Sequence, residues 1–437
     1  MTENFKEVNE CYTLQEAIRE AQRCLHCAVP QCRKGCPISN EIPDWIAELG
    51  KGNFGNAMSI INKRSNLAAV CSRVCAHERQ CEGSCILGKK GERIHIGKLE
   101  RFVADFDSTA GIEHEKIPEK SRGKVAVIGS GPAGLTIAGD LSRRGFAVEI
   151  FEMEPEAGGV LMFGIPEYRL PKEVVRREIK KIANLGVVFH LNTIIGEHYT
   201  IDDLFDAGFD AIFMGTGTGV PKRLDIPGIE SAGVLQAISF LREVSLHESG
   251  YMSREEVPVE EGDRVFVVGC GNTAIDAART AVRMGASRVT VLYHRTINEM
   301  KALRSEYDEA VAEGISFIWN SDVINVTGKD YGKLSSIDVK IEGEIRRFPA
   351  DELILAVGSS PAARIVSSSK GIEVDERGYV LTREEPYGMS TRRGVFAGGD
   401  VTNRPATVVH AMLDAQKVAK GIEQYIDAVK LMEIIDK

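Results

Sequence analysis

Two stretches of the chain repeat one pattern, which restricts the fold more than any other feature. In the first, the apolar run 124–128 leads into a loop with three spaced glycines and then into a helix-like stretch. In the second, the run 264–268 leads into Gly269-Cys270-Gly271 and another helix-like stretch. A buried strand followed by such a loop and a helix is typical of dinucleotide-binding α/β domains. We therefore expect two doubly wound, mostly parallel sheets.

The first of these loops is expected to hold the pyrophosphate of a dinucleotide. Its glycines permit a tight turn and close approach of the phosphates, which the helix N-terminus then faces. The next apolar run, 147–151, is followed by an acid that can accept hydrogen bonds from ribose hydroxyls. A glycine-rich structural turn without a ligand is the alternative. The predicted contacts are Gly129, Gly131, Pro132, Ala133, Gly134 and Glu152.

The second loop is followed by different chemistry. After the strand expected at 288–293 stand His294 and Arg295 instead of an acid, and Lys301 comes shortly afterwards. A carboxylate would repel a 2′-phosphate, whereas an arginine fork binds one. With the loop residues Gly269 and Gly271, these cations suit NADP(H) or at least do not reject it. A role as solvated surface charges is the alternative for them.

A third signal lies near the end of the chain. A short apolar strand ends in Gly399-Asp400, and a helix-like stretch runs from Thr407 to about Tyr425. Two nucleotide loops plus this late segment are the layout of flavoproteins that bind FAD beside a nicotinamide nucleotide. In that layout the aspartate contacts the ribityl–phosphate region, and the positive end of the helix stabilises negative charge on the flavin.

Eight of the ten cysteines lie between residues 24 and 85. They form two quartets, Cys24-x2-Cys27-x4-Cys32-x3-Cys36-Pro37 and Cys71-x3-Cys75-x5-Cys81-x3-Cys85. Closely spaced thiolates ending in Cys-Pro are typical of ferredoxins, and soft thiolates suit iron–sulfur clusters. Structural zinc and disulfides are the alternatives. Zinc sites favour two tight pairs, however, and disulfide scaffolds are short secreted chains.

Composition narrows the functional classes. The 437 residues carry 54 Lys and Arg against 63 Asp and Glu, a net charge of −9, so a nucleic-acid partner is not expected. No apolar run approaches the roughly 18–20 residues of a membrane span. The polar, acidic N-terminus is unlike a secretory signal. We expect a cytoplasmic protein with no membrane partner.

Several motifs together resemble one family over nearly the whole chain. They are RCLHC…PQCRKGCP, AVCSRVC…CEGSC, IGKLERF, GSGPAGL, GGVLMFGIPEYRLPK, VVGCGNTAIDAA and AGGDV. The chain resembles the small (beta) subunit of bacterial glutamate synthase. It also resembles the N-terminal half of dihydropyrimidine dehydrogenase, the bacterial NAD(P)H-oxidising subunit of that enzyme, and the large subunit of the bifurcating NADH-dependent ferredoxin:NADP oxidoreductase.

The resemblance implies an electron-input subunit of a hetero-oligomer. Hydride would pass from NAD(P)H to FAD, and single electrons would then pass to two 4Fe–4S clusters. A larger catalytic subunit or a ferredoxin-like acceptor would receive them. The glutamate synthase type is favoured, and the dihydropyrimidine dehydrogenase and bifurcating types are the alternatives. The chemistry belongs to the cofactors, so no side chain is expected to be catalytic.

The resemblance also implies the contacts with each cofactor. One cluster would be held by Cys24, Cys27, Cys32 and Cys85, and the other by Cys36, Cys75, Cys81 and Glu100. Glu100 stands where dihydropyrimidine dehydrogenases have a glutamine, and a surface position on a helix is its alternative. Cys71 is not an implied ligand. Further flavin contacts would be Gly159, Val160, Arg169 and Thr407, and further nicotinamide contacts Asn272, Thr273, Ala356 and Gly358.

The expected architecture has three parts. Residues 1–115 form a helical iron–sulfur domain, residues 122–225 and 355–437 an FAD domain, and residues 226–354 an inserted NAD(P)H domain. Two rival functions are disfavoured by particular residues. A disulfide reductase needs a redox cysteine pair beside the flavin, and residues 121–437 contain only Cys270. A non-catalytic scaffold would not need the intact glycines, Glu152 and Asp400.

Overall fold

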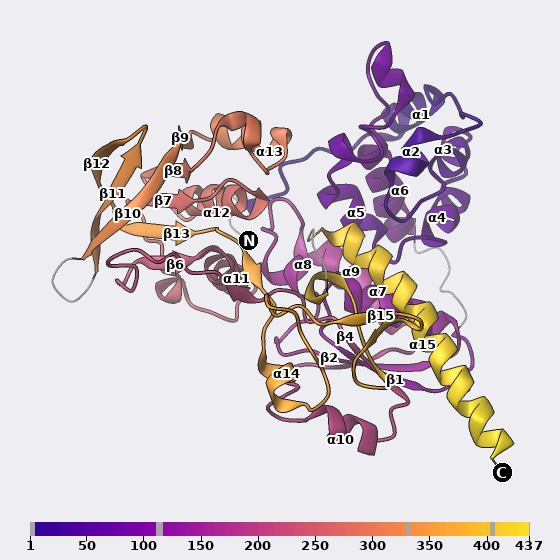
Figure 1. The fold of residues 1–437 in the computed structure, drawn as a ribbon. Coiled ribbons are helices and arrows are strands. Elements are labelled where there is room, and N and C mark those ends of the chain that lie inside the picture. Colours follow the sequence, from indigo (N-terminus) through magenta and orange to yellow (C-terminus); the bar gives the residue numbers. More distant parts are fainter. Residues whose placement is uncertain (1–4, 111–116, 329–332, 403–406, 437) are drawn as a thin grey trace. The chain divides into compact units, whose positions relative to one another are not determined.

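The computed structural model describes residues 5–110, 117–328, 333–402 and 407–436 (Figure 1). The chain separates into two compact units. The inserted unit comprises residues 1–7, 163–168 and 219–360, and the main unit comprises residues 8–162, 169–218 and 361–437. Each has its own sheet and its own core, so each is described separately.

The main unit begins with a helical head. Its first helix starts with a capping box, in which the Thr13 hydroxyl accepts from the Glu16 N–H and the Glu16 carboxylate accepts from the Thr13 N–H. The head buries Trp45, Ile46 and Leu49 on one helix face. Its elements are α1 (Leu14–Gln22), α2 (Gln31–Gly35), α3 (Ile42–Gly50), α4 (Phe54–Asn62), α5 (Ala68–Val74), η2 (His77–Arg79), η3 (Ile86–Lys89) and α6 (Ile96–Ala110).

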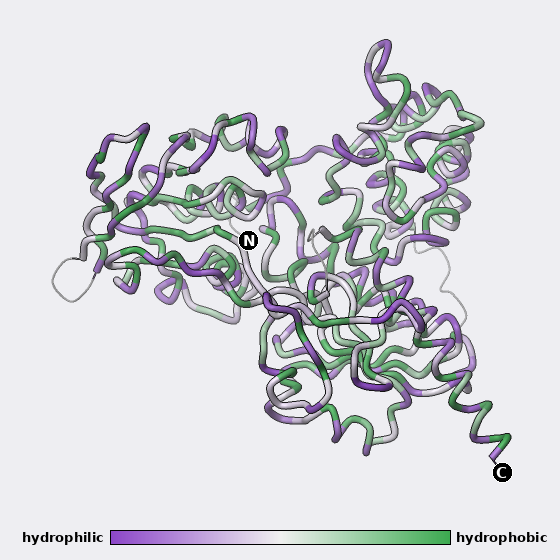
Figure 2. The backbone as a smooth tube through the Cα atoms, in the orientation of Figure 1, coloured by the Kyte–Doolittle hydropathy of each residue, from purple (hydrophilic) through white to green (hydrophobic). Residues whose placement is uncertain are grey.

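A seven-stranded sheet forms the rest of the main unit's core. Its order is β15-β16-β17-β4-β1-β2-β3, and the strands from β17 to β3 run parallel. These strands are coloured mostly hydrophobic in Figure 2, as expected for strands covered on both faces. They are β1 (Lys124–Ile128), β2 (Ala147–Phe151), β3 (Val188–His190), β4 (Ala211–Met214), β15 (Thr382–Glu384), β16 (Tyr387–Ser390) and β17 (Val395–Ala397).

Helices pack against this sheet and connect it to the head. The long helix α15 lies along α7 (Figure 1). Asn66, at the start of the segment leading to α5, donates from Nδ2 to the Thr136 carbonyl and to Asp140 Oδ1 at 3.0 and 2.8 Å. Helix α5 also contacts α15. The helices are α7 (Pro132–Arg143), α8 (Val160–Phe163), α9 (Lys172–Ala183), α10 (Ile201–Asp206), α14 (Arg364–Ser368), η7 (Gly399–Val401) and α15 (Val408–Ile435).

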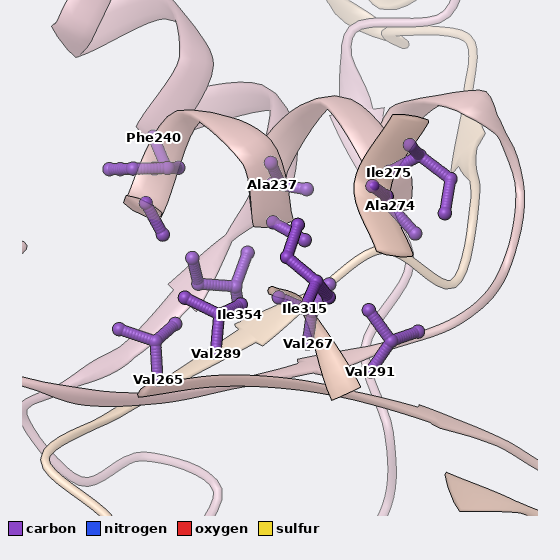
Figure 3. Close-up of a cluster of buried hydrophobic side chains, with 14 of the residues drawn as sticks. Ala237, Phe240, Val265, Val267, Ala274, Ile275, Val289, Val291, Ile315 and Ile354 are labelled. Carbon is purple, nitrogen blue, oxygen red and sulfur yellow. The ribbon is translucent and has the colours of Figure 1, made fainter. Parts of the chain in front are cut away.

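The inserted unit has a five-stranded parallel sheet, ordered β6-β13-β7-β8-β9. Helix residues such as Phe240 and Ile275 cover the strand residues Val265 and Val291 on one face (Figure 3). The core also includes Phe5, which packs against Tyr168 with ring centroids 6.4 Å apart. The strands of this sheet are β6 (Val234–Gln236), β7 (Arg264–Val268), β8 (Arg288–Tyr293), β9 (Ser316–Trp319) and β13 (Glu352–Leu355). Two short strands, β5 (Val220–Pro221) and β14 (Ser359–Ser360), form a separate antiparallel pair.

The other elements of this unit are helices and a separate antiparallel sheet. The sheet has the order β10-β11-β12 and packs its inner face into a second cluster of buried apolar residues. The elements are α11 (Ala237–Glu248), η4 (Arg254–Glu256), α12 (Asn272–Arg283), η5 (Ile297–Glu299), α13 (Arg304–Ala312), β10 (Ser321–Gly328), β11 (Leu334–Ile341) and β12 (Glu344–Pro349).

The fold class predicted from the sequence is confirmed: a helical head precedes two doubly wound α/β sheets, one of them inserted. The late helix is longer than expected, because α15 continues past Tyr425 to Ile435. The three-part division with its bounds stays a prediction. Residues 111–116, at its first boundary, lie outside the described residues.

Candidate cofactor sites

Four cysteines from three segments of the head line one cavity, which we name the first cysteine cavity. Cys24 follows α1, Cys32 lies in α2 and Cys85 precedes η3. The Cys24 and Cys32 sulfurs each accept a backbone N–H, from His26 and Arg33. The remaining wall is largely apolar. The lining residues are Cys24, Leu25, Cys27, Gln31, Cys32, Ile42, Pro43, Ile46, Cys85, Ile86, Leu87, Ile94 and Ile96.

A second group of cysteines lines a neighbouring cavity in the head, the second cysteine cavity. It contains the three cysteines and the glutamate predicted for the second cluster. Its wall is more polar than that of the first cavity. The lining residues are Cys36, Ile38, Asn40, Ile42, Trp45, Cys71, Cys75, His77, Gln80, Cys81, Ile96, Glu100 and Val409.

Electrostatics differ among the groups of the second cavity. Burial, with Glu178 nearby, raises the pKa of Glu100 to about 8. Burial lowers the pKa of His77 to about 4, so its imidazole is neutral at pH 7. Cys71 also lines the cavity, and its thiol lies 3.4 Å from the Met412 sulfur of α15. A cation in the cavity would favour ionised Glu100.

The donor sets fit iron–sulfur clusters. All ten cysteines are free thiols. Within the described part of the chain, no three His, Cys, Asp or Glu side chains converge closely enough to share one metal ion. A 4Fe–4S cluster has four irons and takes one thiolate at each, so its ligands surround a cavity instead of meeting at a point. The two predicted ligand sets stay predictions, and each lies around a single cavity.

The first glycine loop connects β1 to α7 and leaves an open face at the helix N-terminus. Gly129 has φ +93°, and a Cβ on Gly134 would lie 1.9 Å from the Gly129 carbonyl oxygen. Gly131 is the N-cap of α7, with Pro132 at the first helical position. No described heavy atom lies within 4 Å of a Cβ built on Gly131. The first and third glycines therefore serve close packing, and the second presents backbone to a ligand.

The acid after β2 is held in place before any ligand binds. Glu152 is buried, and its Oε2 accepts from the N–H and hydroxyl of Ser130 at 2.9 and 2.5 Å. Its Oε1 accepts from the Glu154 N–H at 2.9 Å. The Ser130 hydroxyl also accepts from the Gly158 N–H at 2.8 Å. Ser130 thus joins the loop, the acid and the next glycine pair, a role that the glycine pattern alone does not indicate.

The other predicted flavin contacts come from three places in the main unit. A Cβ on Gly159 would lie 2.9 Å from the Gly131 Cα, so these two loops touch. Val160 is exposed and Arg169 is buried. Burial and Asp414 raise the pKa of Asp400 to about 6, while Asp414 itself accepts from the Gly399 N–H at 2.7 Å.

The start of α15 is formed by Thr407, its exposed N-cap. Its hydroxyl lies 2.5 Å from His410 Nδ1. The first-turn N–H groups of a helix have no partner within the helix and favour negative charge nearby. Thr407 as a flavin contact stays a prediction.

The second glycine loop, in the inserted unit, repeats the geometry of the first. Gly269 has φ +119°, and its Cβ would lie 2.5 Å from the Ala356 carbonyl oxygen. Gly271 is the N-cap of α12, and no described heavy atom approaches its Cβ position within 4 Å. Asn272 Oδ1 accepts from the Leu303 N–H at 3.0 Å, which positions the segment that contains Lys301. Gly358 accepts from the Lys222 N–H at 2.9 Å.

The cations after β8 are exposed, as a phosphate-binding group must be. His294 and Arg295 are in contact, with Arg295 Nε 3.1 Å from His294 Nε2. The sequence pattern missed an acid here: Glu299 Oε1 lies 3.8 Å from Arg295 Nη1. Glu299 also closes a capping box with Thr296, a Thr-x-x-Glu pattern that could have revealed it. The positive charge of Arg295 is therefore partly neutralised by Glu299, which lies in the same turn.

Comparisons with known proteins define the class of protein. Residues 1–112 match the family described as dihydropyrimidine dehydrogenase domain II, 4Fe-4S cluster. Residues 123–415 match pyridine nucleotide-disulphide oxidoreductase. A solved thioredoxin reductase from Lactococcus lactis has a TM-score of 0.55 and 24% identity over 70% of this chain and 99% of its own, a likeness of fold. The chain is an NAD(P)H-dependent flavin and iron–sulfur oxidoreductase.

Curated relatives identify the family. The glutamate synthase [NADPH] small chain of Halomonas elongata is 35% identical over 97% of this chain and 93% of its own length. The NAD-dependent dihydropyrimidine dehydrogenase subunit PreT of Escherichia coli is 31% identical over 96% and 97%. The chain belongs to the family of these FAD- and 4Fe–4S-containing oxidoreductases, as its motifs predicted. Both relatives are named as parts of larger enzymes.

Among the described helices, none is both long and apolar enough to cross a bilayer.

Proposed function

We propose that this chain is the electron-input subunit of a glutamate synthase-type enzyme, oxidising NADPH and delivering electrons to a larger catalytic subunit. The Halomonas elongata relative is named as the small chain of such an NADPH-dependent enzyme. The second nucleotide loop agrees with this choice of donor, because exposed His294 and Arg295 come after it in place of an acid.

One observation carries the proposal: the second cysteine cavity is lined by Val409, in the first turn of α15. That turn follows Thr407 directly, and Thr407 is the predicted flavin contact. Cys71 and Met412 reinforce the same connection between head and helix. Helix α15 thus connects the predicted flavin site with a cluster cavity within the main unit, and this supports electron transfer between the two groups.

The chain's own side chains have positioning roles. When bound, FAD and the clusters supply the redox chemistry, accepting hydride and releasing single electrons. The open backbone at Gly131 and the first N–H groups of α7 receive the pyrophosphate. The Ser130-bound carboxylate of Glu152 accepts from the ribose hydroxyls. Asp400, in η7 before α15, orients the ribityl–phosphate region.

The ligands of the two clusters complete the proposal. Cys24, Cys27, Cys32 and Cys85 hold one cluster in the first cysteine cavity. Cys36, Cys75, Cys81 and Glu100 hold the other in the second. A reducing compartment suits a head so rich in free thiols, and we propose the cytoplasm.

Anaerobic purification tests the proposal directly. The native chain should contain FAD and the iron of two 4Fe–4S clusters, and NADPH should reduce an artificial dye through it. A colourless protein without iron or flavin would disprove it.

Substitution tests the ligand that distinguishes the second cluster. Glu100→Gln should alter the EPR spectrum of one reduced cluster, because a carboxylate donor is replaced by an amide. Asp107→Asn on the same helix, whose partner is Lys181 at 3.6 Å, is the matched control. Equal spectra for the two variants would refute Glu100 as a ligand.

Co-purification from the native host identifies the partner. We expect a large subunit that carries out glutamate synthesis. The 31% identical PreT subunit favours one second candidate, a pyrimidine-reducing enzyme. A pyrimidine-binding partner in the complex would replace the first assignment by the second and leave the electron-input role intact.

A further inference from the structure

We propose that Trp45 and His77 donate hydrogen bonds to the cluster of the second cysteine cavity and thereby raise its reduction potential. The inference rests on the proposed function, which assigns a cluster to that cavity. It concerns two residues of the chain that are not ligands, and it makes them positioning residues for the electron-transfer step.

Trp45 supplies the first donor. It lies in α3, is 1% exposed, and lines the second cysteine cavity. Its indole Nε1 is buried and has no hydrogen-bond partner among the described residues. An indole nitrogen can only donate, and buried donors nearly always have a partner. Because the side chain lines the cavity, a cluster bound there can supply that partner.

His77 supplies the second donor. Its Nε2 is also buried without a partner among the described residues, and its side chain lines the same cavity. The 3₁₀ turn fixes its backbone, because the His77 carbonyl accepts from the N–H groups of Gln80 and Gly83 at 3.1 and 3.0 Å. A neutral imidazole has one N–H donor, and the proposal places that proton on Nε2.

Gly97 makes room for this imidazole. A Cβ on Gly97 would lie 2.6, 2.7 and 2.8 Å from His77 Cε1, Nε2 and Nδ1. The ring therefore lies directly on the first turn of α6. Gly97 and Glu100 are three residues apart and so lie on neighbouring positions of one helix face. The glycine of the Ile-Gly-Lys-Leu segment thus holds the imidazole beside the predicted carboxylate ligand.

The first cysteine cavity offers a contrast within the same head. None of the unpartnered buried polar atoms in the described chain belongs to a residue that lines it. Its wall beyond the cysteines consists mainly of Leu, Ile and Pro side chains. Unpartnered donors are therefore concentrated at one of the two cavities.

The physical effect arises from charge. Reduction adds one negative charge to the cluster, and N–H groups directed at its sulfurs stabilise that charge. Hydrogen bonds to charged acceptors are about twice as strong as those between neutral groups. We expect each donor to make reduction about tenfold more favourable, which is about 59 mV for a one-electron couple.

The test uses the full-length protein, purified anaerobically with FAD and clusters. Trp45→Phe removes one N–H and keeps an aromatic ring, and His77→Leu removes the imidazole donor. His77→Gln keeps an amide donor. Trp319→Phe, in β9 of the inserted unit, is the matched control for loss of an indole. Iron and sulfide are measured first, and EPR-monitored redox titration then gives the potential of each cluster.

In Trp45→Phe and His77→Leu, one and the same cluster signal should become harder to reduce, by about 59 mV in each. The other signal should not move, and His77→Gln and Trp319→Phe should resemble the native protein. Unchanged potentials at full iron content would overturn the inference. Loss of one cluster in both His77 variants would make His77 a ligand, and its loss in Trp45→Phe would make Trp45 a structural residue; either result overturns the donor role. Native protein lacking the clusters would instead defeat the proposed function.

Discussion

The two glycine loops are nearly the same in backbone and opposite in the charge of the residues behind them. Both start at a glycine with positive φ, and both end at an N-cap glycine whose Cβ position faces open space. Behind the first stands Glu152, buried and held by Ser130. Behind the second stand exposed cations. We expect the shared part to bind the pyrophosphate that all dinucleotides have, and the residues after the next strand to provide selectivity.

The two sites also differ in how firmly their charged side chains are held, because Glu152 is fixed by hydrogen bonds and Arg295 is exposed. Both oxygens of Glu152 are already positioned by N–H and O–H donors, so little ordering is needed when ribose hydroxyls bind. Arg295 has a flexible side chain in solvent and a nearby acid, Glu299. Fixed contacts suit a resident flavin, and exposed cations suit a nucleotide that enters and leaves at each turnover.

The largest expected effect comes from the third loop position, where the first loop has Gly134 and the second has Ala274. Gly134→Ala places a methyl group 1.9 Å from the Gly129 carbonyl oxygen. Backbone must move, which should cost about 3 kcal/mol and abolish FAD retention. Thermal unfolding measures the loss of stability, and the flavin content of the purified variant measures the loss of FAD.

The mirror variant Ala274→Gly, at the same position of the second loop, should cost only about 1 kcal/mol. Full flavin retention in Gly134→Ala would show that the first loop can accommodate a methyl group at this position, contrary to the prediction.

The second-largest effect is expected from substitution of Glu152, the acid of the first site. Glu152→Gln removes the charge that strengthens its hydrogen bonds, worth about 1.5–3 kcal/mol, so FAD affinity should fall by about 10–100-fold. Titration of the flavin-free protein with FAD gives the dissociation constant. Glu149→Gln, in β2 just before Glu152 and paired with His190 at 2.7 Å, is the control. The same small loss in both variants would contradict the ribose role.

A smaller effect is expected at the second site, because its cations are exposed to solvent. Arg295→Ala should raise the KM for NADPH about tenfold and leave that for NADH nearly unchanged, since only NADPH has a 2′-phosphate. Arg288→Ala, at the other end of β8, should affect neither. Equal losses for both nucleotides would show that Arg295 does not distinguish them.

The smallest expected effect concerns Glu299, the acid beside the cations of the second site. Glu299→Gln removes the acid 3.8 Å from Arg295 and keeps a side chain able to close the capping box. Exposed ion pairs contribute about 0.2–1 kcal/mol, so the KM for NADPH should fall by about two- to threefold. Steady-state kinetics with both nucleotides measures this, and a higher KM for NADPH would show that Glu299 supports the cations.

Local patterns in the sequence predicted the elements that carry the loops. Strands β1, β2, β7 and β8 have the bounds that their apolar runs indicate, because each is a mostly buried apolar run followed by glycine or polar residues. The end of α15 was missed. Its buried face stops at Ile426, and no glycine or proline marks a stop beyond it.

Contacts between distant segments could not be predicted in this way. Trp45, His77 and Val409 meet at one cavity from three separate segments, and no local spacing indicates it. The ligand sets came from resemblance, since thiol spacing alone suggested two groups of four consecutive cysteines. The role of Glu299 was not predicted for a different reason. Its carboxylate affects the charge of the second site only because the turn after β8 places it near Arg295.

The burial of Phe5 has a consequence for the order in which the protein matures. Phe5 is 2% exposed and belongs to the core formed by residues 219–360, together with Tyr168. A ribosome releases Phe5 long before residues 219–360, and so before that core exists. The inserted unit therefore cannot close during synthesis until its last strands emerge, and the amino-terminal segment must wait for them.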